Sequence, residues 1–439
     1  MAMHSRRREP GEQVSECQFP FGTEGIYNMP IRYCTLRPNC AITVRTAEGR
    51  CDNVNQAEFR RPNGAFVQGI GGYAAFVPSP LYPEMEWTAD LVRDLSMADR
   101  ALGQLAGVGQ SLVNPQLLMR PFLKREAALS SRIEGTMASL SDLFFFEAAP
   151  EATVPSGAAD VTEIANYVRA LDLGLRSCSR RPLGLNTLRE MHAVLMEDVR
   201  GADKRPGDFR KDRNWIGPPR CRLDEATYVP PPPEELRNLL DKFEKALHDA
   251  PENVPPLVRF AAVHYQFEAI HPFMDGNGRI GRLLITLLLC RERLLSQPLL
   301  YLSAYFERYR DDYYRHLLAV SQTRSWTEWI RFFLRGVYEQ AQDAMERSRR
   351  LLELRERFHR QFHEARSSAL LLKLIDHLFT APVITINKAA DLLGVTYHSA
   401  QDNIGRLVAG GVLREITGRK RDRIYMSRKI LDAVERPLS

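Results

Sequence analysis

The chain has 439 residues, more than a single ordinary hydrophobic core uses, so two or three domains are expected. Hydrophobic residues make up 44% and charged residues 26% of the sequence, which are the proportions of a soluble globular protein. The formal charge of +6 is mild for this length and permits a local phosphate or nucleic-acid site without requiring one. The seven cysteines show no CxxC pair, which argues against zinc and predicts free thiols in a reducing cytoplasm.

The first part of the sequence carries many turn-forming residues and no sustained hydrophobic period. We therefore expect residues 1–65 to be a poorly ordered or loosely attached N-terminal extension, followed by an extended entry segment over 71–83. No apolar region follows "MAMHSRRREP", so a secretory signal is not expected. The longest aliphatic run, Leu283–Cys290, is too short for a bilayer, which needs about 20 residues. These features predict a cytoplasmic protein without a membrane span.

Most of the remaining chain has helical periodicity. Amphipathic helices are expected over "WTADLVRDLSMADRALGQLAGV" and over "PQLLMRPFLKREAALSSRIEGTMASLSDLFFF", the second being stopped by Gly135. The segment 205–236 is rich in proline, glycine and charge, and its extended pieces around Asn214–Ile216 and Ala226–Val229 predict a hairpin. The fold class is therefore mainly α, with one small β-hairpin flap.

Two apolar helices flank the stretch "HPFMDGNGRIGR" at residues 271–282. In "PLVRFAAVHYQFEAIHPF" the apolar residues follow one helical stripe, and Pro272 predicts that this helix ends at His271. A second helix restarts near Arg279 and is apolar on nearly all sides through Leu283–Leu289, which predicts a central place in the core.

The polar residues between these helices suit a polyphosphate. The "GNG" glycines allow positive φ, so that consecutive N–H groups point into one concavity at a helix N-terminus. Arg279 and Arg282 share one face of the first helical turn, and Asp275 offers a hard oxygen ligand for Mg²⁺. His271 stands at the rim as a candidate base. Taken singly, the histidine could be structural and the Asp and Asn ordinary turn residues.

The arrangement resembles the Fic/DOC family, whose motif is HxFx[DE]GNGRxxR. The matching positions are His271, Phe273, Asp275, Gly276, Asn277, Gly278, Arg279 and Arg282. The similarity extends from about Gly71 to Tyr338 and implies a Fic-type helical core. It also implies a reaction in which a protein hydroxyl attacks the α-phosphorus of ATP, giving an AMP–protein and pyrophosphate.

The resemblance implies roles for individual residues. His271 would be the general base, Phe273 would hold the loop, and Asp275 would bind Mg²⁺. Gly276, Asn277 and Gly278 would form the anion hole, with Asn277 orienting the α-phosphate. Arg279 would contact the β-phosphate and Arg282 the γ-phosphate. Further ATP-binding positions would be Gly281, Tyr313 and Leu317, although a Tyr–Leu pair at that spacing is at least as often part of a core.

Two other features of the same family bear on the target and the reaction. Asn214, Trp215 and Ile216 would belong to the flap that aligns the target as an added strand. Kinase-like relatives carry lysine at the third motif glycine, whereas this chain carries Gly278, which favours AMP transfer. The target implied is an unidentified protein, with the chain itself included, and a homodimer is left open.

The stretch "SSRIEG" at 130–135 fits the family's inhibitory motif. Ser130 and Glu134 are four residues apart and therefore share one helix face. A Glu134–Arg282 ion pair would occupy the γ-phosphate site and inhibit the enzyme, whereas the alternative is a solvated surface glutamate. In some relatives the same glutamate positions water that removes AMP, so the reverse reaction stays open.

The last 70 or so residues predict a separate module that looks like a winged helix-turn-helix. Gln401, Asn403 and Arg406 would face a DNA major groove, and the turn "GRKR" would follow phosphates. The alternative is a dimer or protein contact. A DNA-binding regulator with a nucleotide-sensing Fic domain is thus a competing function.

The expected domain order follows from these motifs. It runs through an extension (1–65), a helical region with the inhibitory helix (66–150), the Fic catalytic domain (151–340), a helical connector (341–370) and the winged helix-turn-helix (371–439).

Overall fold

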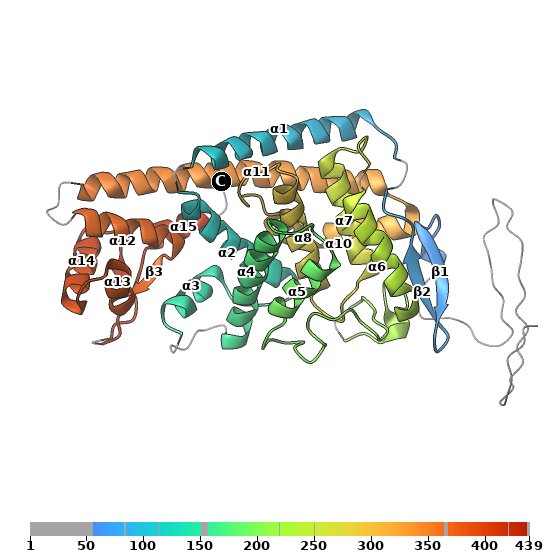
Figure 1. The fold of residues 1–439 in the computed structure, drawn as a ribbon, viewed down its shortest axis with the longest axis horizontal. Helices are drawn as coiled ribbons and strands as arrows, with labels where there is room; N and C mark the ends of the chain where they lie inside the picture. The colour runs from blue at the N-terminus through green and yellow to red at the C-terminus, as the bar shows by residue number, and fades with distance from the viewer. Residues whose placement is uncertain are drawn as a thin grey trace, which may run out of the picture. The chain divides into compact units, whose positions relative to one another are not determined.

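The computed structural model describes residues 56–82, 85–112, 114–150, 157–218, 220–249, 251–363, 368–419 and 421–436. As predicted, these residues are mainly helical, with small antiparallel sheets (Figure 1). Within them, every helix is too short or too polar to cross a lipid bilayer. The helices up to residue 362 are α1 (Ala89–Ser111), α2 (Gln116–Ile133), α3 (Leu140–Ala148), α4 (Ala158–Cys178), α5 (Leu185–Leu195), α6 (Pro233–His248), α7 (Pro256–Ile270), α8 (Asn277–Arg291), α9 (Ser303–Arg308), α10 (Arg310–Thr323) and α11 (Trp326–Phe362).

The first described residues form a hairpin that the sequence analysis did not predict. Strand β1 (Gly64–Gly69) pairs antiparallel with β2 (Tyr73–Pro78). Gly71 and Gly72 make the turn with φ values of +94° and +77°, a conformation that only glycine adopts without strain. A Gly-Gly pair between two β-forming runs is a hairpin signal. The sequence analysis predicted only an extended entry segment over 71–83, so it missed this hairpin.

The expected boundary of the N-terminal extension is also wrong at its C-terminal end. Residues 1–55 lie outside the described residues, whereas Phe59 is buried and packs edge-on against Phe66 of β1, with ring centroids 4.8 Å apart. The backbone N–H of Arg61 donates to the Gln322 carbonyl at 3.1 Å. Residues 56–65 therefore belong to the folded core because an aromatic cluster and backbone hydrogen bonds hold them there.

Helix α11 is the longest described element and includes most of the expected helical connector. It continues for 37 residues without a break into the expected 341–370 segment, where Ala341 and Leu351 are buried. Helix α1 lies along it (Figure 1), and Arg331 of α11 donates from Nε to Asp94 of α1 at 2.8 Å. The start of α1 is defined by Thr88, whose side chain accepts from the Leu91 N–H.

The core that carries the motif is built around α7 and α8. Helix α8 contacts α2, α4, α5 and α7, which explains why its sequence is apolar on nearly all sides. His264 of α7 is completely buried and joins three elements. One ring nitrogen contacts the Gly281 carbonyl of α8 at 3.1 Å, and the other contacts the Tyr313 hydroxyl of α10 at 2.8 Å. His264 is thus a structural residue of the core.

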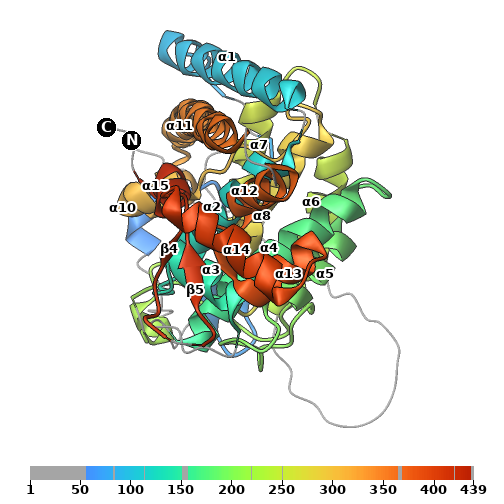
Figure 2. The same ribbon diagram turned by 90° about the vertical axis from the view of Figure 1, so that its left-hand side faces the viewer.

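The C-terminal part, shown end-on in Figure 2, packs against the inhibitory-motif helix α2. Its sheet has the order β3-β5-β4 with both pairings antiparallel, and β3 was not predicted. Lys124 of α2 connects the two parts through the Thr380 carbonyl at 3.4 Å. The elements are α12 (Ser368–Thr380), β3 (Val383–Thr385), α13 (Ile386–Leu393), α14 (Tyr397–Ala409), β4 (Arg414–Glu415), β5 (Ile424–Met426) and α15 (Arg428–Glu435).

A buried arginine joins α11 to α15. Arg347 donates to the Asp343 carboxylate at 2.6 and 2.9 Å and to the Val434 carbonyl at 2.5 Å. Replacing it by methionine leaves the half-buried Asp343 with one weaker cationic partner, so we expect the free energy of unfolding to fall by about 3 kcal/mol. Urea denaturation measures the free energy of unfolding, and hydrogen exchange at α15 measures how firmly this helix is held.

The matched control is Arg349→Met on the same helix, because Arg349 pairs with Glu346 and Glu353 in solvent. It should leave the unfolding midpoint unchanged. An equal loss of stability in both variants would show that the buried network does not hold α15.

Candidate active site

The motif loop is held by its own residues. Helix α7 ends at Ile270 as predicted, and His271 caps it in the left-handed conformation, with φ of 52°. Asn277 closes the loop from the start of α8: its side chain accepts from the Phe273 N–H and donates to the Phe273 carbonyl, both at 2.8 Å. Gly276 precedes α8 with φ of +74°, which glycine allows. The amide of Asn277, predicted to orient a phosphate, is thus used to shape the loop.

Phe273 anchors the loop in the core, the structural role predicted for it. Its ring is fully buried and lies parallel to the His192 imidazole of α5, with centroids 3.8 Å apart. The Gly207 N–H donates to His192 Nδ1 at 2.9 Å, so Nε2 carries the proton and donates to the Asp275 carbonyl at 3.0 Å. Burial lowers the pKa of His192 to about 4, which keeps this arrangement in its neutral form.

Two buried arginines follow the loop on α8. Arg279 and Arg282 are each 2% exposed. Arg279 donates to the Met196 sulfur at 3.4 Å, and its contacts with the Glu163 and Asp275 carboxylates are long, at 3.7 and 3.8 Å. Within the described residues, Nε and Nη1 of Arg279 and Nη1 of Arg282 have no hydrogen-bond partner. Buried guanidinium donors are normally satisfied, so three unpaired N–H groups at one loop predict an anionic ligand.

Glu134 and Ser130 hold the second arginine. Arg282 Nη2 contacts Glu134 Oε1 at 2.6 Å, and Nε donates to the Ser130 hydroxyl at 2.8 Å. The ion pair predicted from sequence is present, although through one carboxylate oxygen rather than two. Glu134 caps α2, and Gly135 stops the helix with φ of +95°, as expected. Burial would raise the pKa of Glu134, but the adjacent Arg282 holds it below its usual value.

The Glu134 carboxylate also lies against the motif residue Gly278. A Cβ placed on Gly278 would meet Glu134 Oε1 at 2.3 Å and Arg282 Nη1 at 2.9 Å. A side chain at position 278 would therefore displace the carboxylate. Glycine there permits the close approach of Glu134.

His271 is poised as a neutral base. Its Nδ1 contacts the Glu268 carbonyl at 3.3 Å, and a carbonyl can only accept, so Nδ1 carries the proton and Nε2 keeps its lone pair. Burial, followed by the positive charge of Arg210, lowers the pKa of His271 to about 4. Arg210 donates from Nε to the His271 carbonyl at 2.8 Å and so fixes the strained backbone of the residue.

The metal-binding role of Asp275 stays a prediction, although its carboxylate is partly open to solvent. Its side chain is 45% exposed, Oδ1 accepts from the Gly276 N–H at 2.6 Å, and Oδ2 lies beside Gly201. One carboxylate that keeps solvent access, next to a phosphate site, is how proteins usually hold Mg²⁺.

Comparison with known sequences decides the family. A profile described as "Fic/DOC family N-terminal" matches residues 92–176, and one described as "Fic/DOC family" matches residues 182–289. The chain belongs to the Fic/DOC family.

Named relatives of this Fic/DOC chain match it over a limited part. It is 31% identical over 132 residues to "Protein adenylyltransferase Fic" of Drosophila grimshawi, which covers 29% of this chain and 25% of that protein. It is 38% identical over 86 residues to the protein of the same name from Drosophila yakuba, covering 19% and 16%. The chain thus spans about a quarter or less of the curated relatives it matches.

A solved structure supports the fold. A Fic family protein from Desulfovibrio desulfuricans G20 is similar with a TM-score of 0.51 at 19% identity, over 79% of this chain and 98% of that one. At this identity the likeness concerns the mainly helical fold alone.

The flap of this Fic/DOC protein is less regular than predicted. Ile216 and Tyr228 form one antiparallel bridge rather than a two-stranded hairpin, because the short helix Leu223–Glu225 lies between them. Asn214 donates to the Met274 carbonyl at 3.2 Å and so supports the motif loop, and Trp215 folds back to donate to the Cys221 carbonyl. Ile216 is 37% exposed, and its role in docking a target stays a prediction.

The predicted adenine contacts also stay predictions. Tyr313 is 1% exposed, and its hydroxyl is occupied by His264, which is the behaviour of a core residue. Leu317 is half-buried. The neighbouring Tyr314 is 41% exposed. Burial and then the negative charge of Glu134 raise the pKa of Tyr314 to about 12, so this tyrosine lies close to the Glu134–Arg282 pair.

Sequence reasoning missed residues that come from distant elements. Glu163 of α4 faces Arg279, and His192 of α5 supports Phe273, but no local pattern marks either residue. Gly281, predicted to bind ATP, lies against Glu268. A Cβ added to Gly281 would meet the Glu268 carboxylate at 2.3 Å. Burial raises the pKa of Glu268 to about 8. A carboxyl group one turn before the motif, inside an otherwise apolar helix, is a signal that could have been noted.

Three buried histidines make stability depend on pH. The pKa values of His192, His264 and His271 are lowered to about 4, 3 and 4 by burial, whereas unfolded histidine titrates near 6.5. Between these values the unfolded chain binds more protons, so stability is lost as pH falls. We expect the free energy of unfolding to drop by about 1–3 kcal/mol from pH 6 to pH 5, because the raised pKa of Glu268 offsets about one of the three histidines. Urea denaturation across pH 5–7 measures it.

The control is His264→Gln, which removes one of these groups and leaves His192 and His271 in place. Its unfolding free energy should change less steeply with pH. A flat profile in the unaltered protein would contradict the burial of neutral imidazoles.

Proposed function

We propose that this protein transfers AMP from ATP to a Ser, Thr or Tyr hydroxyl of a protein and that Glu134 inhibits the reaction. The unpaired buried donors of Arg279 and Arg282 carry the proposal, because two buried cations at the N-terminus of α8 suit a polyphosphate. The names of the curated relatives, protein adenylyltransferases, agree with this reaction.

The chain's own groups account for each step. His271 Nε2 takes the proton of the target hydroxyl while the oxygen of that hydroxyl bonds to the α-phosphorus. The bond from the α-phosphorus to the bridging oxygen breaks, and pyrophosphate leaves against Arg279 and Arg282. Asp275 would hold Mg²⁺, which supplies charge neutralisation to the phosphates.

Glu134 competes with the substrate for Arg282. A charge-assisted hydrogen bond of this kind is worth about 1.5–3 kcal/mol, or roughly ten- to hundredfold in the affinity for a correctly placed ATP. The isolated protein is therefore weakly active in this proposal.

Labelling with α-³²P-ATP and Mg²⁺ tests both parts. Glu134→Ala should raise AMP incorporation into a lysate protein or into the chain itself about ten- to hundredfold, because Arg282 becomes available to the phosphates. His271→Ala in the same background should abolish incorporation, and mass spectrometry should find AMP on a hydroxyl side chain.

The matched control is Glu147→Ala. Glu147 also forms a 2.6 Å ion pair with α2, through Lys124, but lies away from Arg282. It should leave incorporation unchanged. If Glu134→Ala incorporates no label at any Mg²⁺ concentration, the proposed reaction is wrong.

AMP removal by the same site is a second candidate, because the Glu134 carboxylate lies against the anion loop at Gly278 and is placed to orient a water. It predicts the opposite dependence: Glu134→Ala would abolish the release of AMP from a pre-labelled protein.

We further propose that residues 368–436 form a winged helix-turn-helix that contacts DNA. Support comes from α13, the Gly394 turn with φ of +69°, α14 and the three-stranded sheet. Gln401 is exposed, but Asn403 is 5% exposed and bonds to the Ser399 carbonyl, so its predicted place in a groove is wrong. Lys420 of the turn lies outside the described residues.

A gel-shift assay of the full chain measures this binding. Arg421→Ala with Arg423→Ala should weaken it and reduce the slope of log affinity against log salt by about 2. Arg349→Ala with Arg357→Ala, on exposed positions of α11, is the control. Binding that is insensitive to salt, or equally weakened in both pairs, would argue against a DNA-binding module.

A further inference from the structure

A cavity of about 560 Å³ lies on the face of α2 opposite the candidate active site. Ser130 of this helix contacts Arg282, whereas Ala128 and Arg132 line the cavity. Residues two apart on a helix point in nearly opposite directions, at about 200°. The remaining walls come from the start of α3, from α9, from α11 and from α15. The cavity thus lies between α2 and α15, two helices that also contact each other directly.

The cavity collects positive charge. Five of its lining residues are arginines, against two glutamates: Arg125, Arg132, Arg308, Arg347 and Arg428. The ion pairs of three of them are long, at 3.4 Å for Arg125 and 3.8 Å for both Arg132 and Arg308. Among the described residues, none of these three guanidinium groups donates a hydrogen bond to protein. Guanidinium donors at such distances are available to another anion.

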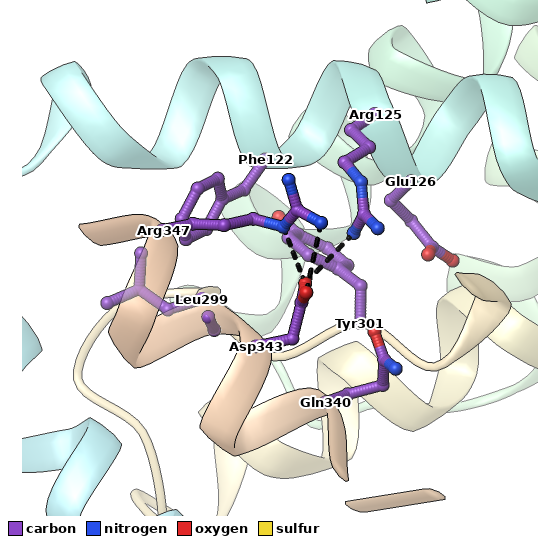
Figure 3. A pocket seen from close by; sticks show the side chains of 9 residues that line it. Phe122, Arg125, Glu126, Leu299, Tyr301, Gln340, Asp343 and Arg347 are labelled. Atoms are coloured by element: carbon purple, nitrogen blue, oxygen red, sulfur yellow. Dashed lines mark hydrogen bonds and ion pairs between the residues drawn. The ribbon is translucent and has the colours of Figure 1, made fainter. Parts of the chain in front are cut away.

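Among these arginines, Arg125 is the strongest candidate to bind another anion. Its side chain is 21% exposed, and it shares the Asp343 carboxylate with Arg347, which takes the two short hydrogen bonds (Figure 3). Burial, and then the like charge of Arg347, lower the pKa of Arg125 to about 10. Two cations therefore share the Asp343 carboxylate, with Glu126 as a further nearby acidic group.

We propose that this cavity binds a small phosphorylated molecule of mononucleotide size. Its volume lies within the range of about 300–1,000 Å³ that is usual for ligand sites. The phosphate would meet the loosely paired arginines, which favour bidentate contacts with such groups. Ala128, Leu129 and Leu140 offer an apolar wall for a base or another nonpolar body.

Binding there acts on the inhibitory helix. Arg125 and Arg132 extend from α2, the helix whose last residue is Ile133 and whose cap is Glu134. A ligand that holds these arginines together with Arg428 of α15 fixes α2 against the C-terminal part. The effect on catalysis rests on the proposed role of Glu134, whereas the binding itself does not.

Isothermal titration calorimetry of the full chain tests the site, with guanosine 5′-monophosphate and uridine 5′-monophosphate as probes. We expect binding of one molecule per chain by at least one of them. Guanosine and uridine, which lack the phosphate, should bind at least about tenfold more weakly.

Two arginines of the C-terminal end provide a matched pair. Arg428 and Arg436 are both exposed and both pair with Asp432, at 3.0 and 2.8 Å, but only Arg428 lines the cavity. Arg428→Ala should weaken nucleotide binding about tenfold, and Arg436→Ala should not change it. Absence of binding by both nucleotides at millimolar concentration, or equal binding by the two variants, would overturn the site.

Hydrogen exchange separates the coupling from the catalytic proposal. On nucleotide binding, the amides at the end of α2, residues 130–136, should exchange more slowly in the unaltered chain and not in Arg428→Ala. Unchanged exchange despite binding would overturn the coupling. Failure of AMP labelling would contradict only the proposed reaction, because hydrogen exchange is measured without any enzymatic activity.

Discussion

The burial of Arg282 is the constraint on which the rest of the site depends. A guanidinium group with 2% exposure needs an anion, and the fold offers two ways to supply one. One is the Glu134 carboxylate, which arrives from α2, and under the proposed function the other is a phosphate of ATP. In that proposal the catalytic and inhibited forms differ by one ion pair at Arg282 rather than by a change of fold.

The neighbouring elements make this competition sensitive to position. The loop is closed by Asn277 and anchored by the stacked pair Phe273 and His192, so its amides and arginines have little freedom to move. The carboxylate is carried by the end of a helix whose opposite side borders a cavity. In the proposed function, donors fixed by the loop and an acceptor carried by α2 would let the position of this helix control the site.

Much of the candidate site was readable because its residues are consecutive. The loop glycines, Asp275 and both arginines occupy one stretch of twelve residues, so spacing alone places them together. The hairpin β1–β2 was missed although its Gly-Gly turn is a local signal. The contacts of Glu163 and His192 follow from how helices pack, which one sequence does not specify. Asn403 was misplaced because the phase of α14 turns it inward.

The continuity of α11 restricts how such a protein can change. Its 37 residues form one rod of roughly 55 Å at a rise of about 1.5 Å per residue. Inserting or deleting one residue would rotate everything beyond it by about 100° and shift it along the rod. The C-terminal part would then lose its register with α2. Recombination within the family is therefore expected to preserve the length of this helix, or to alter it by whole turns.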